Sequence, residues 1–225
     1  MKQRAAQKLI SGGPRGSSLE FAGQLRSTSS INSAMANAAI DSTSLHLAPD
    51  TWKIFEALTV SKSTSISGSG KESILELQRG FLISMIDVTS DDVVIENLTI
   101  KTESETGATG LVGITITGDR VTVRNCVFVG FKNAIIVRSA TDFVIEGCRI
   151  SNQTGGAIDI NNGDYGIVRG NIIATNATGN EIDLDASSQY NTVYGNVVKG
   201  GAISIATSGG QANKYAANSP AASTV

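Results

Sequence analysis

Two acidic residues that alternate with branched aliphatic residues are the first candidates for chemistry in this chain. Asp159 stands in the segment IDI (158–160) and Asp183 in IDL (182–184), so in extended strands both carboxylates point outward. Close carboxylates raise the pKa of one member of the pair, and glycosidases use such pairs as acid and base. If the chain is a hydrolase, we expect its catalytic residues to be Asp159, Asp183 and Glu181. A solvated acidic stripe or a cation site is the simpler interpretation, and the sequence favours it.

The remaining reactive side chains match no catalytic or metal-binding motif. His46 is the single histidine, and it alternates with two leucines, so it is expected to point outward from a strand. The segment SGSGKES (67–73) does not match a phosphate loop, because Ser65 stands where the first Gly is needed and Glu follows Lys71. No CxxC pair is present. We therefore predict no cofactor and no metal site.

The elements that must position these side chains follow from an internal repeat. An eight-residue pattern recurs at intervals of 22 to 28 residues, as VVIENLTI (93–100), VTVRNCVF (121–128), FVIEGCRI (143–150), GIVRGNII (166–173) and NTVYGNVV (191–198). Alternation with period two predicts short strands with one buried face, and a repeat of this length predicts a solenoid. We therefore predict an all-β fold, a parallel β-helix in which each repeat forms one coil.

Three columns of equivalent positions support this alignment. The first predicts a left-handed bend in every coil, because Gly and Asn tolerate that backbone: Asn97, Asn125, Gly147, Gly170 and Gly195. The second predicts packed, reduced thiols followed by an amide ladder: Leu98, Cys126, Cys148, Asn171 and Asn196. The third predicts charge pairs across neighbouring strands: Glu96, Arg124, Glu146, Arg169 and Tyr194.

A group of outward apolar residues predicts a contact surface between chains. Contiguous apolar residues on the outside of a small protein often mark an interface. We expect a homotrimer whose contact residues are Val127, Ile136, Ile172 and Val197. Scattered surface apolarity is the alternative, since it is common.

Residues 45–77 resemble the entry coils of the pectate-lyase-like superfamily, which includes phage tailspikes. Those coils often contain a strand, Pro-Gly-x-Tyr, a second strand and then Gly-x-Gly, and the matching residues here are Pro49, Trp52, Gly68 and Gly70. Asp50 stands where Gly is usual in the family. The resemblance implies a right-handed, single-stranded parallel β-helix with an N-terminal capping helix. It extends over roughly residues 30–210 and is specific for the fold, not for an activity.

Neither of two enzyme sites known in this superfamily is matched. Pectate lyases need an acidic calcium site with Arg or Lys opposite, but the outward column around the acidic pair carries no basic residue: Asp87, Thr115, Ile136, Asp159, Asp183 and Ser204. The polygalacturonase pattern of Asn-Thr-Asp, Asp-Asp and Gly-His-Gly is also absent.

The sequence divides into four regions. We expect an extended basic arm at 1–29, a capping helix at 30–44, the β-helix at 45–207 and a tail of small residues at 208–225. Residues 1–26 have a local charge balance of +4, because Glu20 alone opposes the five basic residues Lys2, Arg4, Lys8, Arg15 and Arg26. These five are the expected partner-binding residues, since a flexible arm becomes ordered only against a partner.

The net charge, the lengths of the apolar segments and the N-terminal sequence argue against several classes of partner and favour a role in a virus particle. The formal net charge of −2 argues against nucleic acid, and no segment has the ~18 apolar residues of a membrane span. The N-terminus lacks the apolar core of a signal peptide, so we expect assembly in the cytoplasm of a host. The favoured function is a non-enzymatic structural protein of a phage virion: a capsid decoration protein, a head fibre, or a short tail fibre or adaptor. It would attach to other capsid or tail proteins through its arms.

Two other functions stay open at this level. The alternative is a tailspike-like polysaccharide depolymerase, a glycoside hydrolase acting on a glycan of the host surface. A secreted carbohydrate-binding or adhesin module is a third possibility, which the basic arm and the missing signal disfavour.

Overall fold

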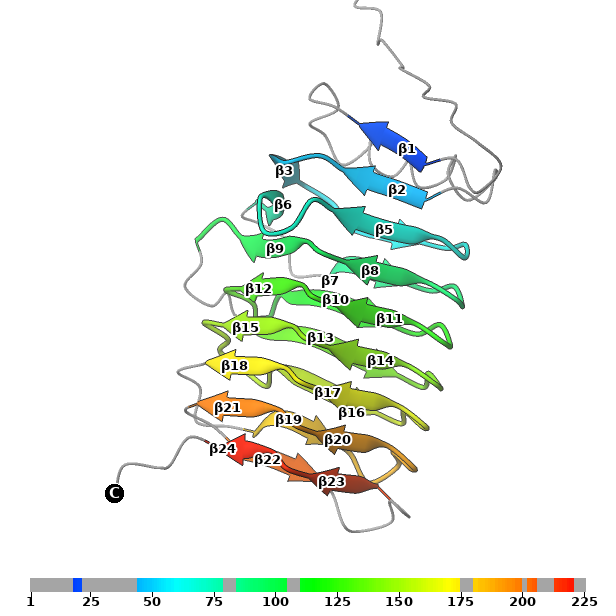
Figure 1. Ribbon diagram of the computed structural model, residues 1–225, viewed down its shortest axis with the longest axis vertical. Helices are drawn as coiled ribbons and strands as arrows, with labels where there is room; N and C mark the ends of the chain where they lie inside the picture. Colours follow the sequence, from blue (N-terminus) through cyan, green and yellow to red (C-terminus); the bar gives the residue numbers. More distant parts are fainter. Residues whose placement is uncertain are drawn as a thin grey trace, which may run out of the picture.

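The protein is a parallel β-helix whose coils stack along one axis (Figure 1). The computed structural model describes residues 18–21, 44–78, 84–104, 110–174, 180–199, 202–205 and 213–220. All regular elements in these ranges are strands, and every strand pair is parallel. None of these segments forms a helix long and apolar enough to cross a membrane. The predicted all-β solenoid is confirmed.

Three sheets run along the length of the solenoid. The nine-stranded sheet contains, in order, β1 (Ser18–Phe21), β2 (Ser44–Leu47), β5 (Ser65–Gly68), β8 (Val94–Glu96), β11 (Thr122–Arg124), β14 (Val144–Glu146), β17 (Ile167–Arg169), β20 (Thr192–Tyr194) and β23 (Lys214–Ala216). The eight-stranded sheet contains β3 (Asp50–Ile54), β6 (Ser73–Leu77), β9 (Thr99–Thr102), β12 (Val127–Val129), β15 (Arg149–Ser151), β18 (Ile172–Ala174), β21 (Val197–Lys199) and β24 (Ser219–Pro220). The seven-stranded sheet contains β4 (Leu58–Val60), β7 (Ser84–Val88), β10 (Val112–Ile116), β13 (Asn133–Arg138), β16 (Ile158–Asn161), β19 (Asn180–Leu184) and β22 (Ala202–Ile205).

The core lies between the sheets and is built from the predicted inward columns. Because parallel neighbours keep the same register, equivalent residues of successive repeats contact one another. The column of Ile95, Val123, Ile145, Val168 and Val193 is in register and fully buried. Burying such a side chain stabilises the fold by about 1.5–3 kcal/mol relative to leaving it exposed.

The five coils from β8 to β21 bend from the nine-stranded to the eight-stranded sheet at the predicted Asn or Gly position. The φ angles there are 57° at Asn97, 53° at Asn125, 64° at Gly147, 63° at Gly170 and 65° at Gly195. Gly and Asn tolerate this left-handed backbone. Ala217 adopts it at the equivalent position of the next coil, with a φ of 53°.

The residue after this bend forms the predicted amide ladder. The backbone N–H of Cys148 donates to Asn171 Oδ1 at 2.9 Å, and that of Asn171 donates to Asn196 Oδ1 at 3.0 Å. Asn218 extends the ladder by one further coil, accepting from the N–H of Asn196 at 3.0 Å. A second, unpredicted ladder joins Asn191 to Asn213 at another corner. The ladders pair buried backbone groups that would otherwise have no hydrogen-bond partner and would destabilise the fold.

Cys126 and Cys148 lie one above the other in the same column. Both are buried and neither forms a disulfide, as expected from the strand spacing. Burial raises the pKa of the Cys126 thiol to about 12 and also raises that of Cys148. Both therefore act as small core residues and not as nucleophiles.

The solenoid extends beyond the limits of 45–207 that the sequence predicts. Strand β1 lies inside the segment predicted to be an extended arm and pairs with β2. Strands β23 and β24 lie inside the predicted tail and pair with β20 and β21. The predicted capping helix at 30–44 lies outside the described residues, except for the first residue of β2, and the five basic arm residues, Lys2, Arg4, Lys8, Arg15 and Arg26, lie outside them entirely.

Candidate functional site

The two predicted acidic residues are neighbours on the outer face of the seven-stranded sheet. Asp159 on β16 and Asp183 on β19 are register partners. The aliphatic residues on either side of each are buried, which leaves the two carboxylates half-buried at the surface. The backbones of the two aspartates are therefore ~4.8 Å apart, which is the spacing between adjacent strands.

Asp159 is held in one orientation by residues from two neighbouring segments. Asn133, the first residue of β13, donates from Nδ2 to Asp159 Oδ2 at 2.6 Å and to the Gly156 carbonyl at 2.9 Å. A Cβ atom at Gly156 would lie only 2.3 Å from Asp159 Oδ1. Asn133 and the missing side chain at Gly156 together position the Asp159 carboxyl.

The pKa of Asp159 is raised from 3.8 to about 6. Burial is the main cause and the neighbouring Asp183 adds to it, while Lys132 opposes the shift. A carboxyl group with such a pKa carries its proton in weakly acidic solution and can act as a general acid there.

Asp183 has a weaker polar partner of the same kind. Asn180, the first residue of β19, donates from Nδ2 to Asp183 Oδ1 at 3.4 Å. Each aspartate thus contacts an asparagine that begins a strand of the same sheet. Within the described ranges, no group of three or more His, Cys, Asp or Glu residues could hold a metal ion.

The raised pKa predicts that Asp159 lowers the stability of the fold at neutral pH. The unfolded carboxyl ionises near 3.8, so as pH rises from there to about 6 the folded state loses stability relative to the unfolded state. Asp159→Asn removes this cost. After allowance for solvent screening of a half-buried group, we expect it to raise the free energy of unfolding by about 1–2 kcal/mol at pH 8. Urea unfolding at pH 8 and below pH 4 checks this, because the gain must disappear at the lower pH.

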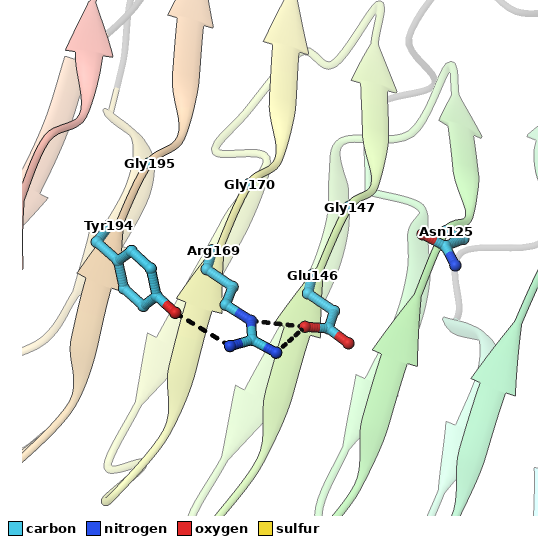
Figure 2. A pocket seen from close by; sticks show the side chains of 7 residues that line it. All are labelled: Asn125, Glu146, Gly147, Arg169, Gly170, Tyr194 and Gly195. Carbon is cyan, nitrogen blue, oxygen red and sulfur yellow. Dashed lines mark hydrogen bonds and ion pairs between the residues drawn. The ribbon is translucent and has the colours of Figure 1, made fainter.

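A second feature lies at the Asn or Gly bend and is shown in Figure 2. The predicted charge column is in register, with Arg124 Nε donating to Glu96 Oε2 at 2.6 Å and Arg169 Nε to Glu146 Oε2 at 2.6 Å. Arg169 Nη1 also donates to the hydroxyl of Tyr194 at 3.0 Å. A shallow hollow of about 330 Å³ lies beside this row, lined by Asn125, Glu146, Gly147, Arg169, Gly170, Tyr194 and Gly195.

A family model described as the right-handed beta helix region matches residues 61–219. The chain belongs to the right-handed β-helix family. The right-handed parallel β-helix expected from the sequence is therefore confirmed. No curated protein matches this β-helix.

Several solved structures share the fold of this β-helix at low sequence identity. An alginate lyase from Paenibacillus sp. str. FPU-7 has a TM-score of 0.66 and 16% identity, with 85% of this chain and 73% of the lyase covered. The catalytic unit of a GH87 α-1,3-glucanase from Streptomyces thermodiastaticus strain HF3-3 has a TM-score of 0.58 and 15% identity, with 89% and 43% covered. ORF18 of Geobacillus virus E2 has a TM-score of 0.58 and 13% identity, with 77% and 38% covered. This β-helix spans less than half of the last two chains.

The other two acidic residues beside the pair, Glu181 and Asp185, differ from it in their surroundings. Glu181, predicted as a third catalytic residue, is 0% exposed, because the register shifts between Asn180 and Ile182 and turns it away from the outer face. Asp185 accepts hydrogen bonds from the N–H of Asn162 and from the hydroxyl of Ser188, which lowers its pKa despite the opposing effect of burial. Among these four acidic residues, Asp159 and Asp183 are therefore the register pair that combines partial exposure with a raised pKa on one carboxyl group.

The predicted contact residues lie on two different sheets. Val127, Ile172 and Val197 line up with Arg149 on the eight-stranded sheet, and each is half-buried. Ile136 lies on the seven-stranded sheet beside Asp159 and is only 6% exposed. The four residues therefore do not form one face, and trimer formation through the other three stays a prediction.

Asn133, Gly156 and Asn180 are site residues that sequence reasoning missed. Both asparagines are the first residue of a strand in the seven-stranded sheet, and that shared position was the available signal. No sequence pattern pointed to Gly156, because its importance depends on where the Asp159 side chain lies.

Proposed function

We propose that this right-handed β-helix cleaves a polysaccharide at the pair formed by Asp159 and Asp183. The observation that carries the proposal is the adjacent pair in which one carboxyl group has its pKa raised to about 6. Glycoside hydrolysis needs two such groups in different protonation states, one acid and one base or nucleophile. The alginate lyase and the α-1,3-glucanase, which share the fold, lend support because both act on polysaccharides.

The ~4.8 Å spacing of the two strands that carry the pair favours a retaining mechanism. Carboxyl groups ~5–5.5 Å apart suit retaining enzymes, whereas inverting enzymes need a wider separation for a water molecule. Asp159 gives its proton to the glycosidic oxygen as that bond to the anomeric carbon breaks, and the Asp183 carboxylate forms a bond to the same carbon. Water then attacks this carbon, Asp159 takes up the proton of the water, and the bond to Asp183 breaks.

Release of new reducing ends tests the proposal. Alginate, pectin and α-1,3-glucan are incubated with the wild-type protein and with the Asp159→Asn, Asp183→Asn double variant at pH 5. Release by the wild type alone supports the proposal. Equal release by both proteins, or none from any polysaccharide, contradicts it.

A structural role in a phage particle is the second candidate, supported by the similarity to the Geobacillus virus protein. In this role the basic residues near the N-terminus would bind an acidic surface of a capsid or tail, and the solenoid would act as a stiff rod. Deletion of residues 1–29 should then prevent incorporation into particles, while the aspartate double variant should be incorporated normally. Normal incorporation of the deletion variant would exclude an anchoring arm.

A further inference from the structure

The hollow at the bend between the nine-stranded and eight-stranded sheets is separate from the acidic pair. It has a volume of about 330 Å³, and its lining comes from the bends of four successive coils and the strand ends before them. The acidic pair lies on the seven-stranded sheet, and neither aspartate lines the hollow. A ligand in the hollow would therefore bind without contacting the proposed catalytic residues.

One wall of the hollow is a fixed row of an aromatic ring, a guanidinium group and a carboxylate (Figure 2). Arg169 is held from both sides, by Glu146 Oε2 and by the Tyr194 hydroxyl. Tyr194 is 36% exposed, and the side chain of Arg169 is also partly exposed. The row offers a ring surface beside hydrogen-bonding groups whose positions are set before a ligand arrives.

The floor is open because three successive coils have Gly at the bend. Gly147, Gly170 and Gly195 have left-handed backbone, and the same position carries a side chain at Asn97 and Asn125. A Cβ atom at Gly170 would lie no closer than 4.0 Å to any neighbouring atom, and the same holds at Gly195. An Asn at either position would therefore fit the backbone but fill part of the hollow.

The backbone of the floor has no donor left for a ligand. The N–H groups of Gly147, Gly170 and Gly195 donate to the carbonyls of Arg169, Tyr194 and Ala216 in the next coil. An extended peptide, which binds sheets through backbone hydrogen bonds, finds no donor here. Hydrogen-bond donors for a ligand therefore come from the side chains of Arg169, Tyr194 and Asn125, and Glu146 supplies an acceptor.

We propose that this hollow binds a neutral oligosaccharide. A sugar ring presents an apolar face of C–H groups, which suits the Tyr194 ring, and hydroxyl groups, which suit a carboxylate, a guanidinium group and an amide. The charge of Arg169 is already matched by Glu146, so the hollow has no excess positive charge for an anionic sugar. The site goes beyond the proposed cleavage, because it would hold a glycan on a different face of the solenoid.

Binding is measured by isothermal titration with α-1,3-linked gluco-oligosaccharides in the Asp159→Asn, Asp183→Asn background, so that cleavage cannot interfere. We expect Tyr194→Ala, Arg169→Met and Gly170→Asn each to weaken binding at least tenfold. Arg124→Met is the matched control, because Arg124 makes the same type of ion pair with Glu96 in the same column but does not line the hollow. Unchanged urea midpoints for Gly170→Asn show that this variant is folded.

Four results would overturn the proposal. The first is the absence of binding, and the second is binding of alginate oligosaccharides in preference to the neutral ones. The third is an equal loss in the Arg124→Met control, and the fourth is full affinity in Gly170→Asn. Binding is measured in the variant that lacks both proposed catalytic carboxylates. Its result therefore does not depend on whether the wild-type protein cleaves a polysaccharide.

Discussion

Asp159→Asn is expected to lower kcat for polysaccharide cleavage by about 10²–10⁴-fold, the usual contribution of a positioned general acid. The amide has nearly the shape of the carboxyl group but no proton to give to the leaving oxygen. Activity of the wild type should fall as pH rises through the Asp159 pKa of about 6, because the acid form is then lost. Steady-state rates between pH 4 and 8 measure both effects, and the residual activity of the variant should lack this decline.

Asp87→Asn is the matched control for this experiment. Asp87 lies in the same outward column on β7, with the strands of Thr115 and Ile136 between it and Asp159. Its replacement should change kcat less than twofold. The same low rate in both variants would mean that loss of negative charge on the sheet, and not loss of an acid, reduces activity. Because Asp159→Asn is also expected to stabilise the fold at pH 8, its inactivity could not be attributed to unfolding.

Asn133→Ala separates positioning from proton transfer. Loss of the hydrogen bond to Asp159 Oδ2 frees the carboxyl group to rotate while leaving its proton available. We expect a smaller fall in kcat, about tenfold, and a shift of the alkaline limb of the pH profile to higher pH, because the ionised form loses a donor. An unchanged profile would contradict the assigned contact.

Asn171→Ala should reduce the free energy of unfolding by about 3 kcal/mol or more, the largest stability effect that we predict. Asn171 Oδ1 accepts from the N–H of Cys148, and its Nδ2 donates to the carbonyl of Ile145 and to Asn196 Oδ1. The side chain is fully buried, so its removal leaves two backbone groups unsatisfied and a space in the core. Urea unfolding followed by circular dichroism measures the loss.

Asn161→Ala provides the comparison for the ladder residue. Asn161 is exposed on β16, and such surface changes usually stay within about 0.5 kcal/mol. If the two variants unfolded at the same urea concentration, the amide ladder would make no net contribution to stability. The ladder would then be only a consequence of the register.

The repeat in the sequence was sufficient to predict the architecture, the bend and one amide ladder. In a parallel solenoid, residues one repeat apart become contacting neighbours, so a column in the alignment is a column in space. This is why Gly147 and Gly170 could be assigned a left-handed bend and Asn171 a partner in Asn196. The outward positions of Asp159 and Asp183 followed from the same period of two.

Only the tertiary structure determines burial and side-chain contacts at the corners, because the segments between repeats differ in length and have no constant register. The shift at Asn180 buries Glu181, Asn133 reaches across to Asp159, and Gly156 makes room for its carboxyl group. The hollow beside Tyr194 likewise depends on how side chains of several coils meet at the surface. Sequence periodicity specifies which residues are stacked, whereas burial and side-chain contacts at irregular positions are set only when the coils pack together.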